Sequence, residues 1–476
     1  MKKILYVAGE ALPFASSGGL GDVIGSLPSA LNGVGEDDVR VIMPLYSQIG
    51  DQYRSKFEYV GYTFVQLSWR HVYCGIFKYE HRGVTFYFLD NEYYFKRGSL
   101  YGEFDDGERF AFFCRAALEV LPIIDFIPDI LHAHDWHAAL SVIYLKRCYA
   151  LNDERYANTK AIFTIHNIQY QGIYGTELLG DIFGLMSWDL GIVEYNNCIN
   201  LLKGAIVCAD AVTTVSPTYA KEILSPKFSH GLDNVLNAYS YKLSGILNGI
   251  DKEYYNPSKD KEIFANFSTR NFGGKKLCKS GLQKMLSLPE RDDVPLIAVI
   301  SRLVSHKGLD LVMLAGDELM KSDVQLVILG MGDKSYEEYF KSLAERYPDK
   351  CKTLITYNRD LSKQIYSAAD LFLMPSRSEP CGLAQMICSR YGAVPVIHET
   401  GGLYDSIKDI GNLGGGNGFT FAAYSAYEML GSIYRAVTIW YEDREFFEKL
   451  QKKVMRVDFS WNQSALSYIE LYKKFD

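Results

Sequence analysis

The feature that most constrains the fold is a unit that recurs along the chain: a short apolar strand, a turn rich in glycine or proline, and a helix. In one copy, the apolar run 370–374 precedes the turn 375–383, and a helical stretch follows over 384–391. Similar apolar runs begin at Lys3, Ile130, Ala161 and Val294. Strands that alternate with helices predict an α/β protein with parallel sheets. In such sheets, ligands bind beyond the carboxyl ends of the strands, so the turns are where a site is expected.

Length and composition narrow the class of protein. The 476 residues are too many for one core and suit two domains. A net charge of −7 without a basic tract argues against a nucleic-acid binder. No run of about 18 apolar residues is found, so no membrane span is expected, and the apolar run after Met1 ends at Glu10, too soon for a signal peptide. Nine cysteines without metal-ligand spacing predict reduced thiols in a cytoplasm.

The turn after the strand 370–374 carries a carboxylate, Glu379, just before a helix. Helix amides at such a place favour anions, and a carboxylate there would repel a phosphate. Glu379 therefore suits sugar hydroxyls or positive charge that develops in a transition state. The alternative is an acidic residue that only stabilises the helix dipole.

A glycine pair, Gly18 and Gly19, lies between the first strand and the first helix, within Ser16-Ser17-Gly18-Gly19-Leu20-Gly21-Asp22. Glycines at this point let the backbone approach a ligand closely, with helix amides facing it. An ordinary glycine turn is an equally good interpretation of this stretch alone.

Polar residues follow two further strands. Residues 130–137 end in the run His132-Ala133-His134-Asp135-Trp136-His137, and the strand from Ala161 ends at His166-Asn167. His132 and His134 alternate on one strand face, so zinc binding with Asp135 is one interpretation. A strand end capped by Asp135 is another. A lone histidine after a strand is usually structural, but several polar strand ends that point the same way indicate a site.

In the second half, Arg302 and Lys307 stand five residues apart after the apolar strand 294–300. Both can reach one anion, such as a nucleoside diphosphate, because arginine binds it bidentately and lysine adds a point charge. A solvated basic turn is the alternative. Near residue 400, the backbone amides of three successive residues can hold phosphate or sugar at a helix start: Gly401, Gly402 and Leu403.

The run Ser376-Arg377-Ser378-Glu379-Pro380-Cys381-Gly382-Leu383 resembles the signature of bacterial glycogen synthases and plant starch synthases. Matching blocks occur in the family's order over nearly the whole chain, and the Arg302-x4-Lys307 block is among the most specific. The resemblance implies the GT-B fold: two Rossmann-like domains, a deep cleft between them, and a C-terminal helix that crosses back to the first domain.

The expected domains follow from this resemblance. Residues 1–248 form an acceptor domain, 249–457 a nucleotide-sugar domain, and 458–476 the helix that packs back on the first domain. Residues 246–251 look like a strand that leaves the first domain, and the Asn248-Gly249 pair is a turn signal.

The implied reaction is transfer of glucose from ADP-glucose to the non-reducing end of an α-1,4-glucan, with retention and without a cofactor or metal. No nucleic acid or membrane partner is implied. The resemblance assigns catalytic roles to Glu379, His166, Arg302, Lys307 and Asp135. It assigns substrate binding to Ser16, Gly18, Gly19, Asp22, Trp136, Asn167, Tyr357, Cys381, Gly382, Leu383, Gly401, Gly402 and Leu403. Tyr357 would stack on the nucleotide base.

One position departs from the family pattern. Ser16 stands where the family has a lysine by the donor phosphates. A charge-assisted hydrogen bond contributes roughly 1.5–3 kcal/mol. Its uncompensated loss corresponds to a roughly ten- to hundredfold loss in rate or affinity. Two alternatives therefore stay open: a retaining glucosyltransferase that uses UDP-glucose or another acceptor, and a glucan-binding paralogue with weak turnover.

Overall fold

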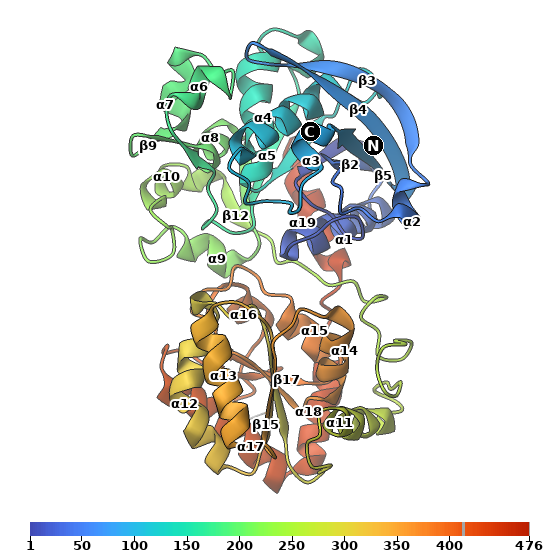
Figure 1. The fold of residues 1–476 in the computed structure, drawn as a ribbon, viewed down its shortest axis with the longest axis vertical. Coiled ribbons are helices and arrows are strands. Elements are labelled where there is room, and N and C mark those ends of the chain that lie inside the picture. Colours follow the sequence, from blue (N-terminus) through green and yellow to red (C-terminus); the bar gives the residue numbers. More distant parts are fainter. Residues whose placement is uncertain (412–414, 476) are drawn as a thin grey trace. The chain divides into compact units, whose positions relative to one another are not determined.

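The chain consists of two compact units, which we describe separately (Figure 1). The computed structural model describes residues 1–411 and 415–475. The first unit comprises Met1–Asn248 and the segment that begins at Trp461, and the second comprises Gly249–Ser460.

The described part of the first unit contains a nine-stranded sheet in the order β12-β11-β7-β6-β1-β2-β5-β4-β3. Its strands are β1 (Lys3–Ala8), β2 (Asp38–Pro44), β3 (Glu58–Leu67), β4 (Arg70–His81), β5 (Val84–Asp90), β6 (Ile130–His134), β7 (Lys160–Ile165), β11 (Ala211–Thr214) and β12 (Leu243–Gly245). β4 runs antiparallel to β3 and β5, and the other pairs are parallel. The central strand β1 is buried from Ile4 to Ala8, which is typical of a parallel sheet covered on both faces.

The longer helices of the first unit bring their amino ends to the carboxyl ends of these strands. They are α1 (Gly19–Val34), α4 (Asp106–Glu119), α5 (Trp136–Tyr144), α8 (Leu201–Cys208) and α19 (Trp461–Lys473). Shorter helices are α2 (Asp51–Arg54), α3 (Glu92–Phe95), α6 (Leu178–Asp181), α7 (Leu190–Val193), α9 (Pro217–Glu222) and α10 (Asp233–Ala238). A small separate sheet holds β8 (Ile173–Tyr174), β9 (Glu194–Tyr195) and β10 (Cys198–Asn200).

The second unit contains a parallel sheet in the order β15-β14-β13-β16-β17-β18. Its strands are β13 (Leu296–Ile300), β14 (Gln325–Leu329), β15 (Cys351–Leu354), β16 (Leu371–Met374), β17 (Val394–His398) and β18 (Phe419–Phe421). The chain builds outward from β13 in one direction and then in the other, so the strand order reverses between β13 and β16. That crevice is where open α/β sheets bind ligands.

Helices cover both faces of this second sheet (Figure 1). One layer holds α12 (Leu309–Lys321), α13 (Lys334–Arg346) and α17 (Ala426–Glu442). The other holds α11 (Gly273–Met285), α14 (Arg359–Ala368), α15 (Ala384–Arg390) and α18 (Arg444–Val454). The short α16 (Gly401–Ser406) follows β17. The expected α/β class with two Rossmann-like sheets is confirmed.

Helix α19 follows the second unit in the chain but packs on α1 of the first. Its buried side chains are Trp461, Ser464, Ala465, Tyr468, Leu471 and Tyr472. Lys2 Nζ donates to the carbonyl of Tyr472 at 2.6 Å, and Ser464 Oγ donates to the carbonyl of Leu247 at 2.5 Å. The end of the chain is therefore tied to its beginning.

The expected strand at 246–251 is wrong. β12 ends at Gly245, and Ile250 makes only an isolated parallel bridge with Ser460. Its N–H donates to the carbonyl of Phe459 at 2.7 Å. The apolar residues of this segment are typical of a strand. However, the segment pairs with another extended segment only at Ile250, so no ladder of hydrogen bonds forms.

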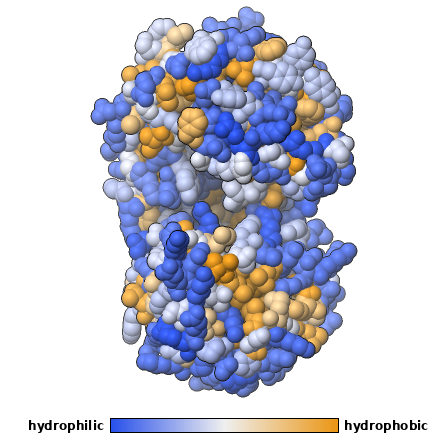
Figure 2. Space-filling model, in the orientation of Figure 1, coloured by the Kyte–Doolittle hydropathy of each residue, from blue (hydrophilic) through white to orange (hydrophobic). Residues whose placement is uncertain are grey.

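No helix among the described residues is long and apolar enough to cross a bilayer. The visible face of each unit is mostly hydrophilic, with scattered apolar side chains (Figure 2).

Candidate functional site

A cavity of about 170 Å³ opens where the strand order of the second sheet reverses. Its walls come from the end of β13, the end of β16 and the start of α15. They include Arg302, Lys307, Ser376 and Glu379. The structure thus brings together two blocks that lie about 70 residues apart in the sequence, because β13 and β16 are neighbours in the sheet.

Lys307 and Glu379 form an ion pair in this cavity. Lys307 Nζ lies 2.9 Å from Glu379 Oε1 and 2.7 Å from Oε2. The side chains are only 17% and 7% exposed. Ser376 Oγ also donates to Glu379 Oε2, at 3.0 Å. A buried carboxylate needs such partners, and here they also set its orientation.

A glycine brings the lysine to this place. Gly308 follows the 3-10 turn Ser305–Lys307 and has φ +71°, a left-handed conformation that favours glycine. A Cβ atom at this position would lie 1.9 Å from the carbonyl oxygen of Pro375. The turn that carries Lys307 can therefore lie directly against the loop that carries Glu379.

The loop 375–383 has its own internal supports. Gly382 has φ +72°, and its Cβ would approach Gln385 Oε1 to 2.6 Å. The side-chain amide of Gln385 donates through Nε2 to the carbonyls of Cys381 at 3.0 Å and Gly382 at 2.8 Å. Cys381 is buried, and Leu383 borders the cavity with Gly382. Arg302 is exposed at the cavity wall, so it can meet an incoming anion.

The amides near residue 400 are partly engaged. Gly402 N–H donates to the carbonyl of Glu379 at 3.1 Å, and Leu403 N–H donates to that of Thr400 at 3.0 Å. The first of these bonds joins α16 to the Glu379 loop. Gly402 permits this because a Cβ there would lie 2.2 Å from the carbonyl oxygen of Cys381. The Gly402 amide thus supports the loop that carries Glu379, and the Leu403 amide closes the first turn of α16.

Tyr357 lies apart from these groups. It follows β15, which stands two strands away from β13 at the edge of the sheet. The ring is 75% exposed, and its hydroxyl accepts from Arg359 Nε at 3.3 Å. An exposed ring is free to stack on a flat partner, although the structure does not bring it to the cavity around Glu379.

In the first unit, the glycine turn after β1 is held by Glu10. The carboxylate accepts the Ser17 N–H at 2.5 Å, the Ser17 hydroxyl at 2.9 Å and the Gly21 N–H at 3.2 Å. Glu10 is 2% exposed, and burial raises its pKa. Gly18 and Gly19 at the start of α1 are exposed. The turn therefore exposes glycine backbone to solvent, while the buried carboxylate of Glu10 accepts hydrogen bonds from two of its amides. Asp22 lies in the first turn of α1.

Ser16 is folded back onto the same turn. Its hydroxyl donates to the carbonyl of Gly18 at 3.1 Å. A Cβ at Gly21 would lie 2.5 Å from Ser16 Cβ, so the two positions are in close contact. The hydroxyl supports the turn and supplies no positive charge.

Asp135 connects the ends of two strands. Its Oδ1 accepts the N–H groups of His166 at 2.7 Å and Asn167 at 3.4 Å. The backbone of Asp135 has φ 58° and ψ 178°, which is sparsely populated and costs roughly 1–3 kcal/mol for a residue other than glycine. Burial raises the pKa of Asp135 to about 7. A strained, buried carboxylate at a strand end is typical of a functional site.

His166 is paired with another histidine. His166 Nε2 lies 3.0 Å from His134 Nδ1, which requires one ring nitrogen to donate and the other to accept. Burial lowers the pKa of His166 to about 3 and that of His134 well below its ordinary value. The pair is therefore neutral near pH 7 and can orient a hydroxyl by hydrogen bonding.

Trp136 and Asn167 directly follow Asp135 and His166 in the chain. Trp136 is 9% exposed and packs on His137, with ring centroids 4.2 Å apart, and edge-on to Phe110 at 5.3 Å. It contributes mostly to packing, with one edge left at the surface. Asn167 accepts the Gln169 N–H at 3.0 Å, so the loop after β7 is a local turn.

The zinc interpretation finds no support in the geometry. Both nitrogens of His132 are engaged, with Tyr472 at 2.9 Å and Thr164 at 2.6 Å. Among the described residues, no group of three or more His, Cys, Asp or Glu side chains is placed to hold a metal ion.

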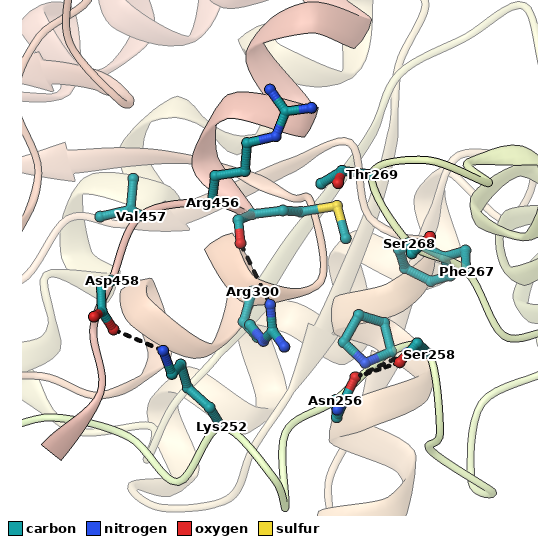
Figure 3. A pocket seen from close by; sticks show the side chains of 12 residues that line it. Lys252, Asn256, Ser258, Phe267, Ser268, Thr269, Arg390, Arg456, Val457 and Asp458 are labelled. Carbon is teal, nitrogen blue, oxygen red and sulfur yellow. Dashed lines mark hydrogen bonds and ion pairs between the residues drawn. The ribbon is translucent and has the colours of Figure 1, made fainter. Parts of the chain in front are cut away.

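A second cavity, of about 250 Å³, lies elsewhere in the second unit (Figure 3). Lys252 pairs with Asp458 at 2.9 Å, and Ser258 Oγ donates to Asn256 Oδ1 at 2.8 Å. Arg390 Nη1 donates to the carbonyl of Met455 at 3.5 Å. These polar groups bond to one another and to the main chain, so we assign this cavity no substrate.

Three supporting residues escaped the sequence interpretation: Glu10, His134 as a partner of His166, and Gln385. Glu10 stood out only as the end of an apolar run. Its position just before a glycine turn was a usable signal, since turn amides need acceptors. The other two contacts depend on the tertiary structure.

Comparison with known proteins shows a match over the whole chain. The starch synthase catalytic domain family matches residues 3–238, and the family of glycosyl transferases group 1 matches residues 283–454. Glycogen synthase of Anoxybacillus flavithermus is 46% identical over 473 residues, which cover 99% of this chain and 97% of that protein. Glycogen synthase of Geobacillus stearothermophilus is 45% identical over 475 residues, with 99% and 97% covered.

Solved structures agree. The catalytic domain of starch synthase IV from Arabidopsis thaliana, bound to ADP and acarbose, matches with a TM-score of 0.92 and 34% identity over 100% of this chain and 99% of that chain. Sucrose-phosphate synthase from Thermosynechococcus elongatus matches with a TM-score of 0.60 and 16% identity, which shows a shared fold alone.

Proposed function

The chain belongs to the family of glycogen and starch synthases and is a glycosyltransferase, and on this premise we propose that it transfers glucose from ADP-glucose to the non-reducing end of an α-1,4-glucan with retention of configuration. The nucleotide-sugar and glucan substrates follow from the family, and the choice of ADP-glucose is part of the proposal. We also infer a cytoplasmic location, which is supported by nine cysteines that form no disulfides.

The observation that carries the proposal is the group of charges at the switch point of the second sheet. Arg302 is exposed at the cavity wall, and Lys307 lies beside it against Glu379. In the proposed reaction, Arg302 binds the diphosphate. Lys307 can shift part of its charge from Glu379 to the phosphate oxygens as the bond to glucose breaks. The cations thus stabilise negative charge that grows on the leaving group.

Glu379 then faces the glucose. Its carboxylate is oriented by Lys307 and Ser376 before substrate binds, so it stabilises the oxocarbenium-like sugar without reorganisation. The first unit contributes the neutral His166 and the buried Asp135. His166 orients a sugar hydroxyl beside the bond that breaks, and Asp135 holds the backbone of His166 in place.

No covalent nucleophile is required in this scheme. Glu379 is already bonded to a cation on both oxygens, which weakens it as a nucleophile. A front-face route is therefore proposed. The departing diphosphate oxygen accepts the proton of the attacking glucan hydroxyl, and the new bond forms on the face that the diphosphate leaves.

The test is release of ADP and UDP from the two nucleotide glucoses with glycogen present, for the wild-type protein and for Ser16→Lys. We expect clear ADP release by the wild type and little UDP release. A gain of ten- to hundredfold in Ser16→Lys would make the missing charge the limiting feature, since that is roughly the effect of one charge-assisted bond.

The outcomes separate the candidates. UDP release in excess of ADP release would replace the donor in the proposal. No release of either nucleotide by either protein, with glycogen binding retained, would favour the second candidate, a glucan-binding paralogue. The observation behind that candidate is that the Ser16 hydroxyl is bonded to Gly18 and supplies no charge.

A further inference from the structure

The ring of His134 is oriented by its neighbours more than by hydrogen bonds. Its Nδ1 contacts His166 Nε2 at 3.0 Å, but its Nε2 is buried and has no hydrogen-bond partner among the described residues. One bond leaves a ring free to tilt. We therefore attribute the orientation mainly to the two rings that pack nearest to it, His132 at a centroid distance of 4.3 Å and Tyr6 at 4.7 Å, while the ring of His166 lies 5.3 Å away.

The side chains of Tyr6 and His132 are both hydrogen-bonded to the same hydroxyl group, that of Tyr472. Tyr472 Oη lies 2.6 Å from the Tyr6 hydroxyl and 2.9 Å from His132 Nδ1. The other nitrogen of His132 lies 2.6 Å from Thr164 Oγ1. Burial lowers the pKa of His132 to about 3, so this ring is neutral and has one donor and one acceptor nitrogen. The chain of bonds from Tyr6 to Thr164 is therefore directional, and Tyr472 is its central link.

Tyr472 belongs to helix α19, whose residues follow the second unit in the chain. It is 1% exposed, and its side chain reaches from α19 to β1 and β6 beneath the polar strand ends. If only an apolar contact were needed at this position, a phenylalanine would pack as well as the tyrosine. The hydroxyl, with two partners at hydrogen-bond distance, points to a more specific role.

We propose that Tyr472 is a positioning residue of the transferase site: its hydroxyl holds Tyr6 and His132 as the two walls that orient His134, and His134 orients His166. This rests on the proposed function, in which His166 contacts the donor sugar. The C-terminal helix then influences the transferase site indirectly, through the contacts of Tyr472.

The first test is Tyr472→Phe, which keeps the ring and removes the hydroxyl. Tyr6 and His132 each lose a partner, so His134 is no longer held and His166 shifts. We expect kcat to fall about tenfold, less than the hundredfold that a displacement of about 1 Å can cause. KM for ADP-glucose should change less than about twofold, because a group that acts at the breaking bond contributes mainly in the transition state.

The second test reads the histidines directly, without substrate. Nitrogen-15 NMR of ring nitrogens distinguishes the two neutral tautomers. We expect His134 and His166 to show one fixed tautomer each in the wild type, and mixed or exchange-broadened signals in Tyr472→Phe. Substitution of each histidine assigns its signals.

Tyr156→Phe is the matched control. Tyr156 is 1% exposed, lies in the same unit, and donates its hydroxyl to the carbonyl of Leu118 at 2.8 Å, remote from the histidines. It should lose comparable stability and leave kcat and the histidine signals unchanged. If Tyr472→Phe does not fold, Tyr6→Phe replaces it, since it removes one of the two bonds and should give a smaller change of the same kind.

Unchanged kcat and unchanged histidine signals in Tyr472→Phe would overturn the proposal. A fall in kcat with unchanged signals would overturn it as well, because the effect would then travel by another route. If the wild type itself transfers no glucose, the proposed function fails, and the NMR comparison still decides whether Tyr472 orients the histidines.

Discussion

At the scale of single residues, the arrangement of Lys307 and Glu379 decides how the candidate site works. Each residue alone has an ordinary explanation, one as a basic turn and the other as a helix-start acid. Paired at 2.7 Å and largely buried, they form a unit in which each depends on the other. A buried ion pair contributes little net stability, but loss of one partner leaves an uncompensated charge.

Lys307→Met should therefore lower both stability and activity. The Glu379 carboxylate, 7% exposed, would lose its cation. We expect the free energy of unfolding to fall by about 3 kcal/mol. We expect kcat to fall at least about a hundredfold, since the leaving-group charge loses a stabilising cation. Urea denaturation and steady-state kinetics measure the two effects.

The double variant Lys307→Met/Glu379→Gln separates these effects. The amide carries no charge, so most of the lost stability should return while kcat stays low. Equal destabilisation in the single and double variants would show that the charge of Glu379 is not what Lys307 compensates.

Asp135 gives a prediction about pH. Burial raises its pKa from 3.8 in the unfolded reference to about 7, so the folded protein holds this proton more tightly. The contribution of Asp135 to the free energy of unfolding is therefore greatest at low pH and falls as pH rises from about 4 to about 7. Asp135→Asn lacks this dependence. The free energy of unfolding of Asp135→Asn, relative to that of the wild type, should rise by an amount on the order of 3 kcal/mol between about pH 4 and about pH 7.

Urea titrations at several pH values check this prediction. The buried histidines, whose pKa values are lowered, favour the folded state as pH rises, but they are present in both proteins and cancel in the difference. A difference between wild type and Asp135→Asn that stays constant from pH 4 to pH 7 would contradict the raised pKa.

At the scale of elements, the turns after the strands are built by a few special backbone positions. Gly308 lets the turn after β13 contact the loop after β16, and Glu10 holds the turn after β1. These residues bind nothing themselves in the proposed reaction, yet they determine where the binding groups lie.

Gly308→Ala should disrupt the site through the backbone. The methyl group would require both a left-handed alanine and a shift of Pro375, whose carbonyl oxygen would lie 1.9 Å from the added Cβ. We expect a loss of about 2–4 kcal/mol in the free energy of unfolding. We also expect at least a tenfold loss of kcat, because Lys307 is the preceding residue. Thermal unfolding and kinetics measure both.

Gly431→Ala is the control for this variant. Gly431 lies inside α17, is exposed, and would place its Cβ in open space. Alanine should stabilise the helix by about 0.5–1 kcal/mol and leave kcat unchanged. A Gly308→Ala protein that behaved like Gly431→Ala would show that the turn tolerates a Cβ.

Glu10→Ala should loosen the glycine turn after β1. Three donors, from Ser17 and Gly21, would lose their acceptor. We expect KM for the nucleotide sugar to rise roughly tenfold, since two or three hydrogen bonds that order the turn are worth about 1–2 kcal/mol of preorganisation. Steady-state kinetics at varied donor concentration measures this. An unchanged KM would mean that the turn is held by its glycines and helix alone.

At the scale of the whole molecule, the last helix belongs to the first unit although it follows the second unit in the sequence. α19 follows the second unit in sequence and packs on the first, so it should unfold with the first unit. Leu471→Ala, at a position 6% exposed, should cost about 2–4 kcal/mol. Hydrogen exchange should become faster in β6 and β7 and stay unchanged in β13 and β14.

Leu319→Ala provides the converse. Leu319 lies in α12 of the second unit and is 1% exposed. It should speed exchange in β13 and β14 and leave β6 and β7 unchanged. Equal acceleration of all four strands in either variant would mean that the two units unfold together.

Local patterns in the sequence determined the class of fold and the turns that carry the candidate site. The alternation of apolar strands, turns and helices indicated an α/β protein with parallel sheets, because strand and helix periodicity arises from contacts between near neighbours. The resemblance to glycogen and starch synthases implied that these sheets form two Rossmann-like domains. The same turns carried Glu379, Arg302 and Lys307, and all three lie in one cavity wall. The segment 246–251 shows the limit of such signals, because a strand forms only where a partner strand exists.

Only the tertiary structure decided which distant groups meet. The pairing of Lys307 with Glu379 depends on β13 lying beside β16, and the contact of Tyr472 with His132 joins residues 340 positions apart. The order of strands and the path of α19 result from how whole elements bury their apolar faces. The polar residues then meet wherever that packing carries them, which no local pattern of residues encodes.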